Sequence, residues 1–220
     1  MMVDYRKILS SGIDQLSLPF NLSSTQVEQL LNYHLLMIKW NGAYNLTAVR
    51  DPVAMLSRHL LDSLSIAPHL FKKNTGQRFI DVGTGAGLPG IVLAILYPEN
   101  DVHLLDSNGK KTRFLFQVKT ELGLDNITVH HSRVEQHSAP DGYDGILSRA
   151  FATLEDMITG SEHLLSNNGS FFAMKGIYPE LEIQRLSSLK KPYKVSACHQ
   201  LFVPGEEGER HLIVISAENS

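Results

Sequence analysis

A glycine-rich turn carries the clearest chemical signal in this chain. Residues 81–90 read Asp-Val-Gly-Thr-Gly-Ala-Gly-Leu-Pro-Gly, after an apolar run that ends in Asp81 and before a helical apolar pattern over 91–97. That context predicts a strand, a tight turn and a helix. Such a turn, with glycine at Gly83, Gly85 and Gly87, brings backbone N–H groups and a helix N-terminus against a ligand.

Two details of the turn distinguish the kind of ligand. Leu88 occupies the slot in which the dinucleotide fingerprint has its third glycine, and Asp81 stands two residues before the first glycine. A pyrophosphate brings its own negative charge, so neither detail suits it. Both details suit a ligand with a cationic centre and an amino-acid tail, and S-adenosylmethionine (SAM) has a sulfonium and an α-ammonium group.

Further candidates follow the other predicted strands, because ligands of doubly wound sheets lie beyond the carboxyl ends of the strands. Asp106 follows the second strand and can accept hydrogen bonds from both ribose hydroxyls; alternatively it caps the next helix. Val134 and Glu135 follow the third strand, where a backbone N–H can read the adenine edge. Arg149 follows the fourth strand and Lys175 the fifth, and these two are the candidate catalytic residues.

The elements that position these residues fall into two parts. Residues 1–75 show helical spacing and predict an N-terminal helical extension, with caps at 23–26 and at 51–52 and a junction over 72–76. Residues 76–220 alternate apolar runs with helical patterns, which predicts an α/β domain with a parallel sheet covered on both faces. The expected strands are 79–82, 102–105, 127–130, 145–148, 170–174, 195–203 and 211–216, and the expected helices are 88–97, 110–122, 154–165 and 179–189.

The last two predicted strands have no helix between them and should form an antiparallel hairpin. A seven-stranded Rossmann-like sheet that ends in such a hairpin is typical of class I SAM-dependent methyltransferases. Within the predicted helices, His59 and Asp62 lie on one face and can pair, which structure explains as well as catalysis does.

Composition limits the partners and the compartment. The 220 residues carry a formal charge of −3, so RNA binding needs a local cationic face, for which the start of the 110–122 helix is a candidate. The single Cys198 cannot form an internal disulfide, and the sequence shows no metal-binding cysteine cluster. We expect a cytoplasmic protein without a signal peptide or membrane span, and a monomer.

With these residues in view, the chain closely resembles the RsmG (GidB) family of 16S rRNA guanine-N7 methyltransferases. The resemblance rests on blocks at 40–47, 58–63, 81–90, 105–111, 132–135, 146–152, 174–176 and 208–212. The glycine motif is generic to methyltransferases, whereas the blocks at 58–63 and 148–151 are much more specific. The resemblance implies SAM contacts at Gly83, Leu88, Val134, Glu135 and Arg149.

The resemblance also implies that the N-terminal helices form part of the active-site and RNA-binding wall. The expected partner is 16S rRNA or a partly assembled small ribosomal subunit, with no DNA and no membrane. Candidate RNA contacts are Arg58, His59, Lys110, Lys111 and Arg210, beside Lys175.

The resemblance implies that the target atom is guanine N7, and this target is consistent with the residues predicted at the site. Guanine N7 has a lone pair and no proton, so no general base is required, and Arg149 should orient the cofactor or a phosphate. The alternatives are a SAM-dependent methyltransferase acting on another RNA, a protein or a small molecule, a nicotinamide-dependent oxidoreductase, and a non-catalytic SAM sensor. Leu88 and the terminal hairpin oppose the oxidoreductase.

Overall fold

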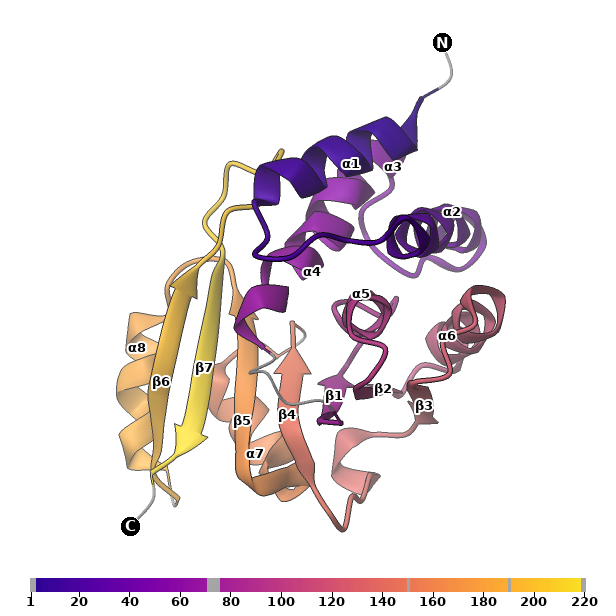
Figure 1. Ribbon diagram of the computed structural model, residues 1–220. Helices are drawn as coiled ribbons and strands as arrows, with labels where there is room; N and C mark the ends of the chain where they lie inside the picture. Colours follow the sequence, from indigo (N-terminus) through magenta and orange to yellow (C-terminus); the bar gives the residue numbers. More distant parts are fainter. Residues whose placement is uncertain (1–2, 71–75, 150, 190, 219–220) are drawn as a thin grey trace.

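Seven strands form one sheet in the order β3-β2-β1-β4-β5-β7-β6 (Figure 1). The computed structural model describes residues 3–70, 76–149, 151–189 and 191–218. The strands are β1 Arg78–Val82, β2 Asp101–Asp106, β3 Ile127–His131, β4 Tyr143–Ser148, β5 Leu165–Lys175, β6 Tyr193–Gln200 and β7 His211–Ala217. Strands β1 to β5 pair in parallel, and β7 runs antiparallel to both β5 and β6. The predicted parallel sheet with a terminal hairpin is therefore confirmed.

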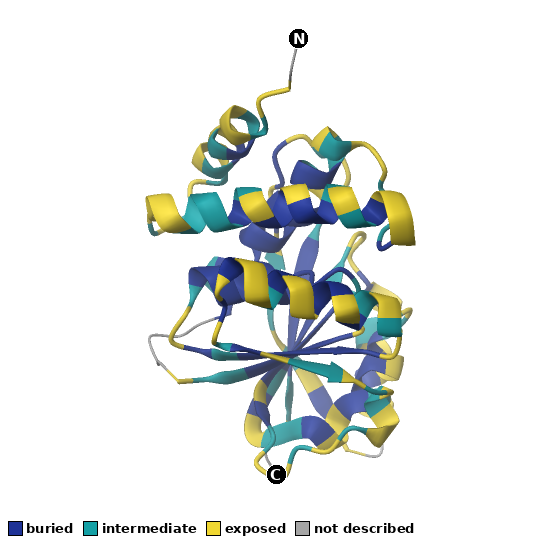
Figure 2. Ribbon diagram, turned by 90° about the vertical axis from the view of Figure 1, so that its right-hand side faces the viewer, coloured by how far each residue is buried: buried dark blue, intermediate teal, exposed yellow. Residues whose placement is uncertain are grey.

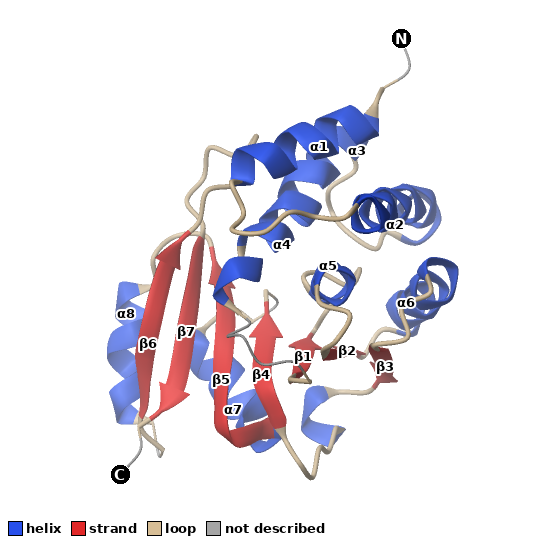
Figure 3. Ribbon diagram, viewed as in Figure 1, coloured by secondary structure: helices blue, strands red, loops and turns tan. Residues whose placement is uncertain are grey.

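Helices cover both faces of the sheet (Figure 3). They are α5 Gly90–Leu96 and α6 Gly109–Leu122 on one face, with α7 Leu154–Ser161 and α8 Glu180–Arg185 on the other. The Asn108 side chain caps α6 by accepting from the Lys110 N–H, and Gly123 ends the helix in the left-handed conformation. Asn108 is thus the N-cap of α6, and Asp106 supports the same helix start because its Oδ1 accepts a hydrogen bond from the Asn108 N–H at 2.8 Å.

The N-terminal part of the chain is helical, as predicted. Its elements are α1 Tyr5–Leu16, α2 Ser24–Tyr44, α3 Pro52–Met55, the π-helix η1 Leu56–Leu61, α4 Asp62–Ser65 and the short 3-10 helix η2 Ala67–His69. Ser23 and Gln26 form a capping box at the start of α2, and Asp51 caps α3 ahead of Pro52. The wider turn of the π-helix was not predicted.

These N-terminal helices lie over α5 and α6 as a further layer, with their buried faces turned toward the sheet (Figure 2). One apolar cluster joins them to α5, α6 and one face of the sheet, and a second fills the space between the other face and α7. The predicted junction at 72–76 lies, apart from Gly76, outside the described part of the chain, and so does one side of the predicted boundary between 75 and 76.

Several predicted bounds differ from the structure. The helix expected over 154–165 ends as a 3-10 turn, η4 Glu162–Leu164, and β5 already begins at Leu165. The strand expected over 195–203 leaves the sheet after Gln200, while the helix expected over 179–189 finishes in the 3-10 turn η5 Leu186–Ser188. Among the described residues, we find no helix with the length and apolar character that a membrane span requires.

Candidate active site

The glycine turn joins β1 to α5 at the carboxyl end of the central strand. Gly83, Gly85 and Gly87 have φ angles of +68°, +62° and +94°, a region that side chains with a Cβ rarely adopt. A Cβ on Gly87 would lie 2.4 Å from Ile91 Cγ1, so this position also requires glycine for packing. At Gly85 the nearest atoms to an added Cβ are 3.9 Å away, which leaves an open cradle above the turn.

Asp81, at the end of β1, is hydrogen-bonded to the turn that follows it. The side chain is fully buried, and its Oδ2 accepts hydrogen bonds from Thr84 Oγ1 at 2.7 Å and from the Gly90 N–H at 2.9 Å. Burial raises the pKa of the carboxyl from 3.8 to about 6, against the opposing effect of these two hydrogen bonds. Asp81 Oδ2 therefore braces the turn, while Oδ1 has no hydrogen-bond partner among the described residues, and a contact of Asp81 with the cofactor stays a prediction.

Tyr33 of α2 also holds the turn, although the sequence did not reveal it. Its buried hydroxyl donates a 2.6 Å hydrogen bond to the carbonyl of Ala86, and burial raises the pKa of this hydroxyl well above its usual value. A tyrosine within a helical apolar pattern predicts only a core position, because its hydroxyl partner lies in a distant segment. The N-terminal helices thus help to shape the ligand-facing turn.

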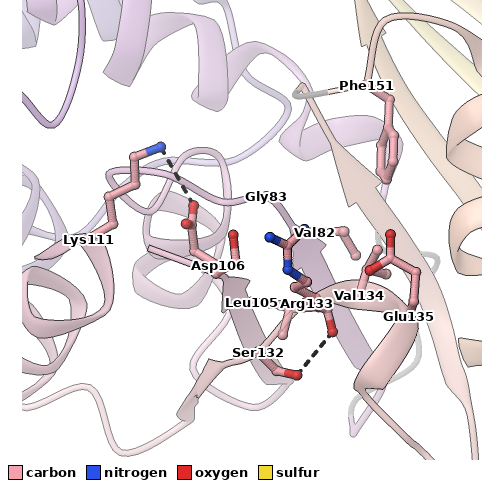
Figure 4. A pocket seen from close by; sticks show the side chains of 11 residues that line it. Val82, Gly83, Leu105, Asp106, Lys111, Ser132, Arg133, Val134, Glu135 and Phe151 are labelled. Atoms are coloured by element: carbon pink, nitrogen blue, oxygen red, sulfur yellow. Dashed lines mark hydrogen bonds and ion pairs between the residues drawn. The ribbon is translucent and has the colours of Figure 1, made fainter. Parts of the chain in front are cut away.

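A cavity of about 340 Å³ opens beyond the ends of β1, β2 and β3, and we call it the strand-end cavity (Figure 4). Its walls include Gly83, Asp106, Lys111, Val134 and Glu135. Asp106 is buried and anchored, because Oδ2 accepts from the Gly85 N–H at 2.9 Å and Oδ1 from the Asn108 N–H at 2.8 Å. A carboxylate has about four lone-pair sites, so acceptor capacity remains for ligand hydroxyls.

Lys111 faces this cavity with its ammonium 3.8 Å from Asp106 Oδ2, as Figure 4 shows. The structure places Lys111 on the wall of the strand-end cavity, and its predicted contact with RNA stays a prediction. Its neighbour Lys110 is exposed, so the structure separates two lysines that the sequence had grouped.

A second cavity, of about 200 Å³, lies above the turn and shares Gly83 with the first; we call it the turn cavity. Thr47, His59, Leu88 and Arg149 contribute to its walls. His59 is buried, and its Nε2 lies 2.8 Å from Thr47 Oγ1. Burial lowers the pKa of His59 to about 4, with a smaller effect of Arg149 in the same direction, so the ring is neutral at physiological pH.

The structure shows a different partner for His59 than the predicted Asp62, because its hydrogen bond is made to Thr47. His59 is buried and lines the turn cavity, and its contact with RNA stays a prediction. Asp62, three residues later, points to a different group of partners.

A third cavity, of about 290 Å³, meets the turn cavity at Arg149, and we call it the arginine cavity. The buried Asp62 lies between two guanidinium groups: Arg149 Nη1 donates to Oδ2 at 3.1 Å, and Arg210 Nε lies 3.3 Å from Oδ1. Burial raises the pKa of Asp62, and the two arginines oppose that shift. The chain thus brings Arg149 and Arg210 together around one carboxylate, a cluster that local sequence patterns could not show.

The remaining cations around this cavity are also paired. Arg58 Nε lies 3.3 Å from Glu206 Oε1, and Lys175 Nζ lies 3.0 Å from Glu182 Oε2. Both cations line the arginine cavity, on which the predicted residues Arg149 and Arg210 also converge.

The strand-end and turn cavities fit a SAM molecule. They meet at Gly83, the cradle at Gly85 is open to a ligand, and Asp106 retains acceptor sites beside the half-buried Val134. The sheet order, the terminal hairpin and this site define a class I SAM-dependent methyltransferase with an N-terminal helical extension.

Comparison with known sequences identifies the family. The GidB family model, described as rRNA small subunit methyltransferase G, matches residues 26–213. The ribosomal RNA small subunit methyltransferase G of Saccharophagus degradans is 54% identical over 200 residues, which cover 91% of this chain and 86% of the relative. That of Stutzerimonas stutzeri is 52% identical and covers 94% and 93% of the two chains. The chain belongs to the GidB family; it is a SAM-dependent rRNA methyltransferase.

Solved structures share the fold at low sequence identity. A SAM-dependent methyltransferase from Aquifex aeolicus superposes with a TM-score of 0.59 at 16% identity, over 78% of this chain and 96% of that chain. A SAM-dependent methyltransferase from Thiobacillus denitrificans in complex with S-adenosyl-L-homocysteine gives a TM-score of 0.54 at 12% identity, over 84% and 98%. The class I methyltransferase fold is therefore confirmed.

Proposed function

We propose that this enzyme methylates N7 of a guanine in 16S rRNA, either naked or in a partly assembled small subunit, and that it works as a monomer in the cytoplasm. The observation that carries the proposal is that Arg149 lines both the turn cavity and the arginine cavity. A base that enters the arginine cavity lies next to the glycine turn, where the methyl donor is held. Family membership supports rRNA as the substrate.

In this proposal, the strand-end cavity holds the nucleoside part of SAM. The Asp106 carboxylate accepts hydrogen bonds from the ribose hydroxyls, and Val134 packs against the adenine near Glu135. The backbone at Gly83, Gly85 and Gly87, together with Leu88, contacts the methionine part in the turn cavity.

The chemistry asks little of side chains beyond positioning. SAM, when bound, supplies a methyl group already activated by its sulfonium centre. Guanine N7 carries a lone pair and no proton, so no residue has to act as a base. The chain's own contribution is to hold the base in line with the methyl group and to exclude water.

Electrostatics give Asp62 a part in this arrangement. N7-methylguanine is cationic, and an unpaired guanidinium beside it would oppose the developing charge. Asp62 pairs with Arg149 at 3.1 Å and with Arg210 at 3.3 Å. Glu206 Oε2 lies 3.5 Å from Arg210 Nη2, so two carboxylates offset the charge of the two guanidinium groups. Arg149 can then orient the cofactor or an RNA phosphate with little repulsion of the product base. Lys175, paired with Glu182, lines the same cavity as a second positioning cation.

The RNA must present the base outside a regular helix. The major groove of A-form RNA is deep and narrow, so N7 is out of reach in a duplex. The base therefore comes from a loop, a bulge or a flipped-out nucleotide. Arg58, Lys110 and Arg210 are the described cations that we assign to the RNA backbone.

Methyl transfer from labelled SAM tests this proposal. Deproteinised 16S rRNA from a strain that lacks this enzyme should take up label and yield 7-methylguanosine on nucleoside mass spectrometry. Matched samples of 23S rRNA, DNA and total protein should stay unlabelled. Label confined to protein or a small molecule, or a different methylated nucleoside, would instead establish one of the alternative methyltransferase functions.

A further inference from the structure

Three large apolar side chains are exposed together at one end of the sheet. Ile177 is 80% exposed, Tyr178 45% and Phe202 63%. We call these three residues the apolar rim. Single exposed apolar residues are common on protein surfaces, whereas a cluster of them marks an interaction site.

The sheet register places the members of the rim close to one another. Lys175 at the end of β5 and Gln200 at the end of β6 both pair with His211, the first residue of β7. Because neighbouring strands lie about 4.8 Å apart, the ends of β5 and β6 are about 10 Å apart. Ile177 and Phe202 each follow two residues after one of these ends.

The apolar rim borders the arginine cavity. Gly176, Leu201 and His211 line that cavity, and the first two directly precede Ile177 and Phe202 in the chain. The ring of Tyr178 packs edge-on against His211, with centroids 5.7 Å apart and an interplanar angle of 65°. The His211 Nδ1 lies 2.9 Å from the Gly176 carbonyl, which ties the β5–α8 loop to β7.

Cations and exposed apolar rings beside one pocket fit single-stranded RNA. Cations hold its backbone, and every unpaired base offers a flat face that stacks on an aromatic or apolar side chain. A duplex hides those faces, so it would gain little from the rim. Resting on the proposed function, we propose that the apolar rim stacks unpaired bases next to the target guanine and so selects single-stranded RNA.

The substitution Phe202→Ala removes one stacking surface from the rim. Phe116→Ala is the matched control, because Phe116 is a 51% exposed phenylalanine on α6 that lines none of the three cavities. Neither exposed ring contributes to the core, so both variants should keep the thermal midpoint of the wild type. Phe202→Tyr should restore stacking.

Fluorescence anisotropy gives the direct measurement, with a 12-nucleotide oligouridylate and a 12-base-pair RNA duplex as probes. Loss of one stacked base weakens binding by about tenfold. Phe202→Ala should show that loss for oligouridylate and no change for the duplex, while Phe116→Ala and Phe202→Tyr match the wild type. In methylation assays with deproteinised 16S rRNA, Phe202→Ala should raise KM for RNA by a similar factor and leave kcat and KM for SAM unchanged.

Equal affinity of the wild type and Phe202→Ala for oligouridylate would overturn the inference. So would a defect that occurs only on assembled small subunits and not on naked RNA, since the rim would then bind a ribosomal protein. If the wild type fails to methylate 16S rRNA, the proposed function fails, and the oligouridylate comparison still decides whether the rim binds unpaired bases.

Discussion

Gly85 and Gly123 offer a matched pair that separates ligand binding from backbone strain. Both residues are left-handed, with φ angles of +62° and +63°. An added Cβ meets nothing within 4 Å at Gly123 and only two atoms at 3.9 Å at Gly85, so alanine fits sterically at either position. Gly85 lies in the turn that faces the cofactor, whereas Gly123 ends α6.

The two alanine substitutions should therefore cost similar stability and differ in SAM affinity. A left-handed alanine costs about 1–2 kcal/mol. For a chain of this length, that lowers the thermal midpoint by about 2–8 °C. Gly85→Ala also places a methyl group in the cradle above the turn. We expect it to weaken SAM binding by at least tenfold, or about 1.4 kcal/mol, while Gly123→Ala leaves the affinity unchanged.

Calorimetric titration with SAM, beside thermal unfolding followed by circular dichroism, measures both quantities on the same samples. Wild-type affinity in Gly85→Ala would refute the placement of the cofactor against the turn. Equal losses of affinity in both variants would show that strain, and not contact with the ligand, controls binding.

Two further substitutions, Asp81→Asn and Asp62→Asn, test the buried carboxylates. The pKa of Asp81 is raised to about 6, so its contribution to stability is fully present below pH 3.8 and is lost as the pH rises through about 6. Asp81→Asn should flatten the unfolding free energy over this range in urea titrations at a series of pH values, and an unchanged slope would assign the titration to other groups. Asp62→Asn removes the buried carboxylate that pairs with two partly exposed guanidinium groups, of which Arg210 keeps its ion pair with Glu206. It should lower the unfolding free energy by about 1.5–3 kcal/mol in urea titrations, whereas an unchanged value would mean that water and Glu206 compensate both arginines.

The sheet was predictable from the sequence because its strands are short apolar runs that can be recognised locally. In β1, Phe79 belongs to one apolar cluster and Ile80 to the other, so alternate side chains pack on opposite faces. The start of β5 was missed because its first residues, Leu-Ser-Asn-Asn-Gly, have the composition of a turn. There Leu165 pairs with Tyr143 next to an irregularity in β4, a tertiary effect that overrides the local preference.

Residues of the candidate site were predictable only where they lie next to the end of a predicted strand. Asp106 and Val134 stand after strands and line the predicted crevice. The Tyr33–Ala86 bond spans 53 residues and the Arg149–Asp62 bond spans 87, so neither leaves a pattern in the sequence. The hydrogen bonds by which Asp81 braces the turn were not predicted, because an acid at the end of a strand can face a ligand or bond the turn, and its type does not distinguish the two.

The hydrogen bond from Tyr33 to the glycine turn bears on the order of events during synthesis. Helices α1 and α2 are translated before any strand of the sheet. The apolar residues on their faces pack against α5, α6 and the sheet, which are translated later. Until the strands arrive, these faces are exposed to other nascent chains and to chaperones. The methyl-donor site is therefore complete only after residues 83–87 have been translated and Ala86 has met the Tyr33 hydroxyl.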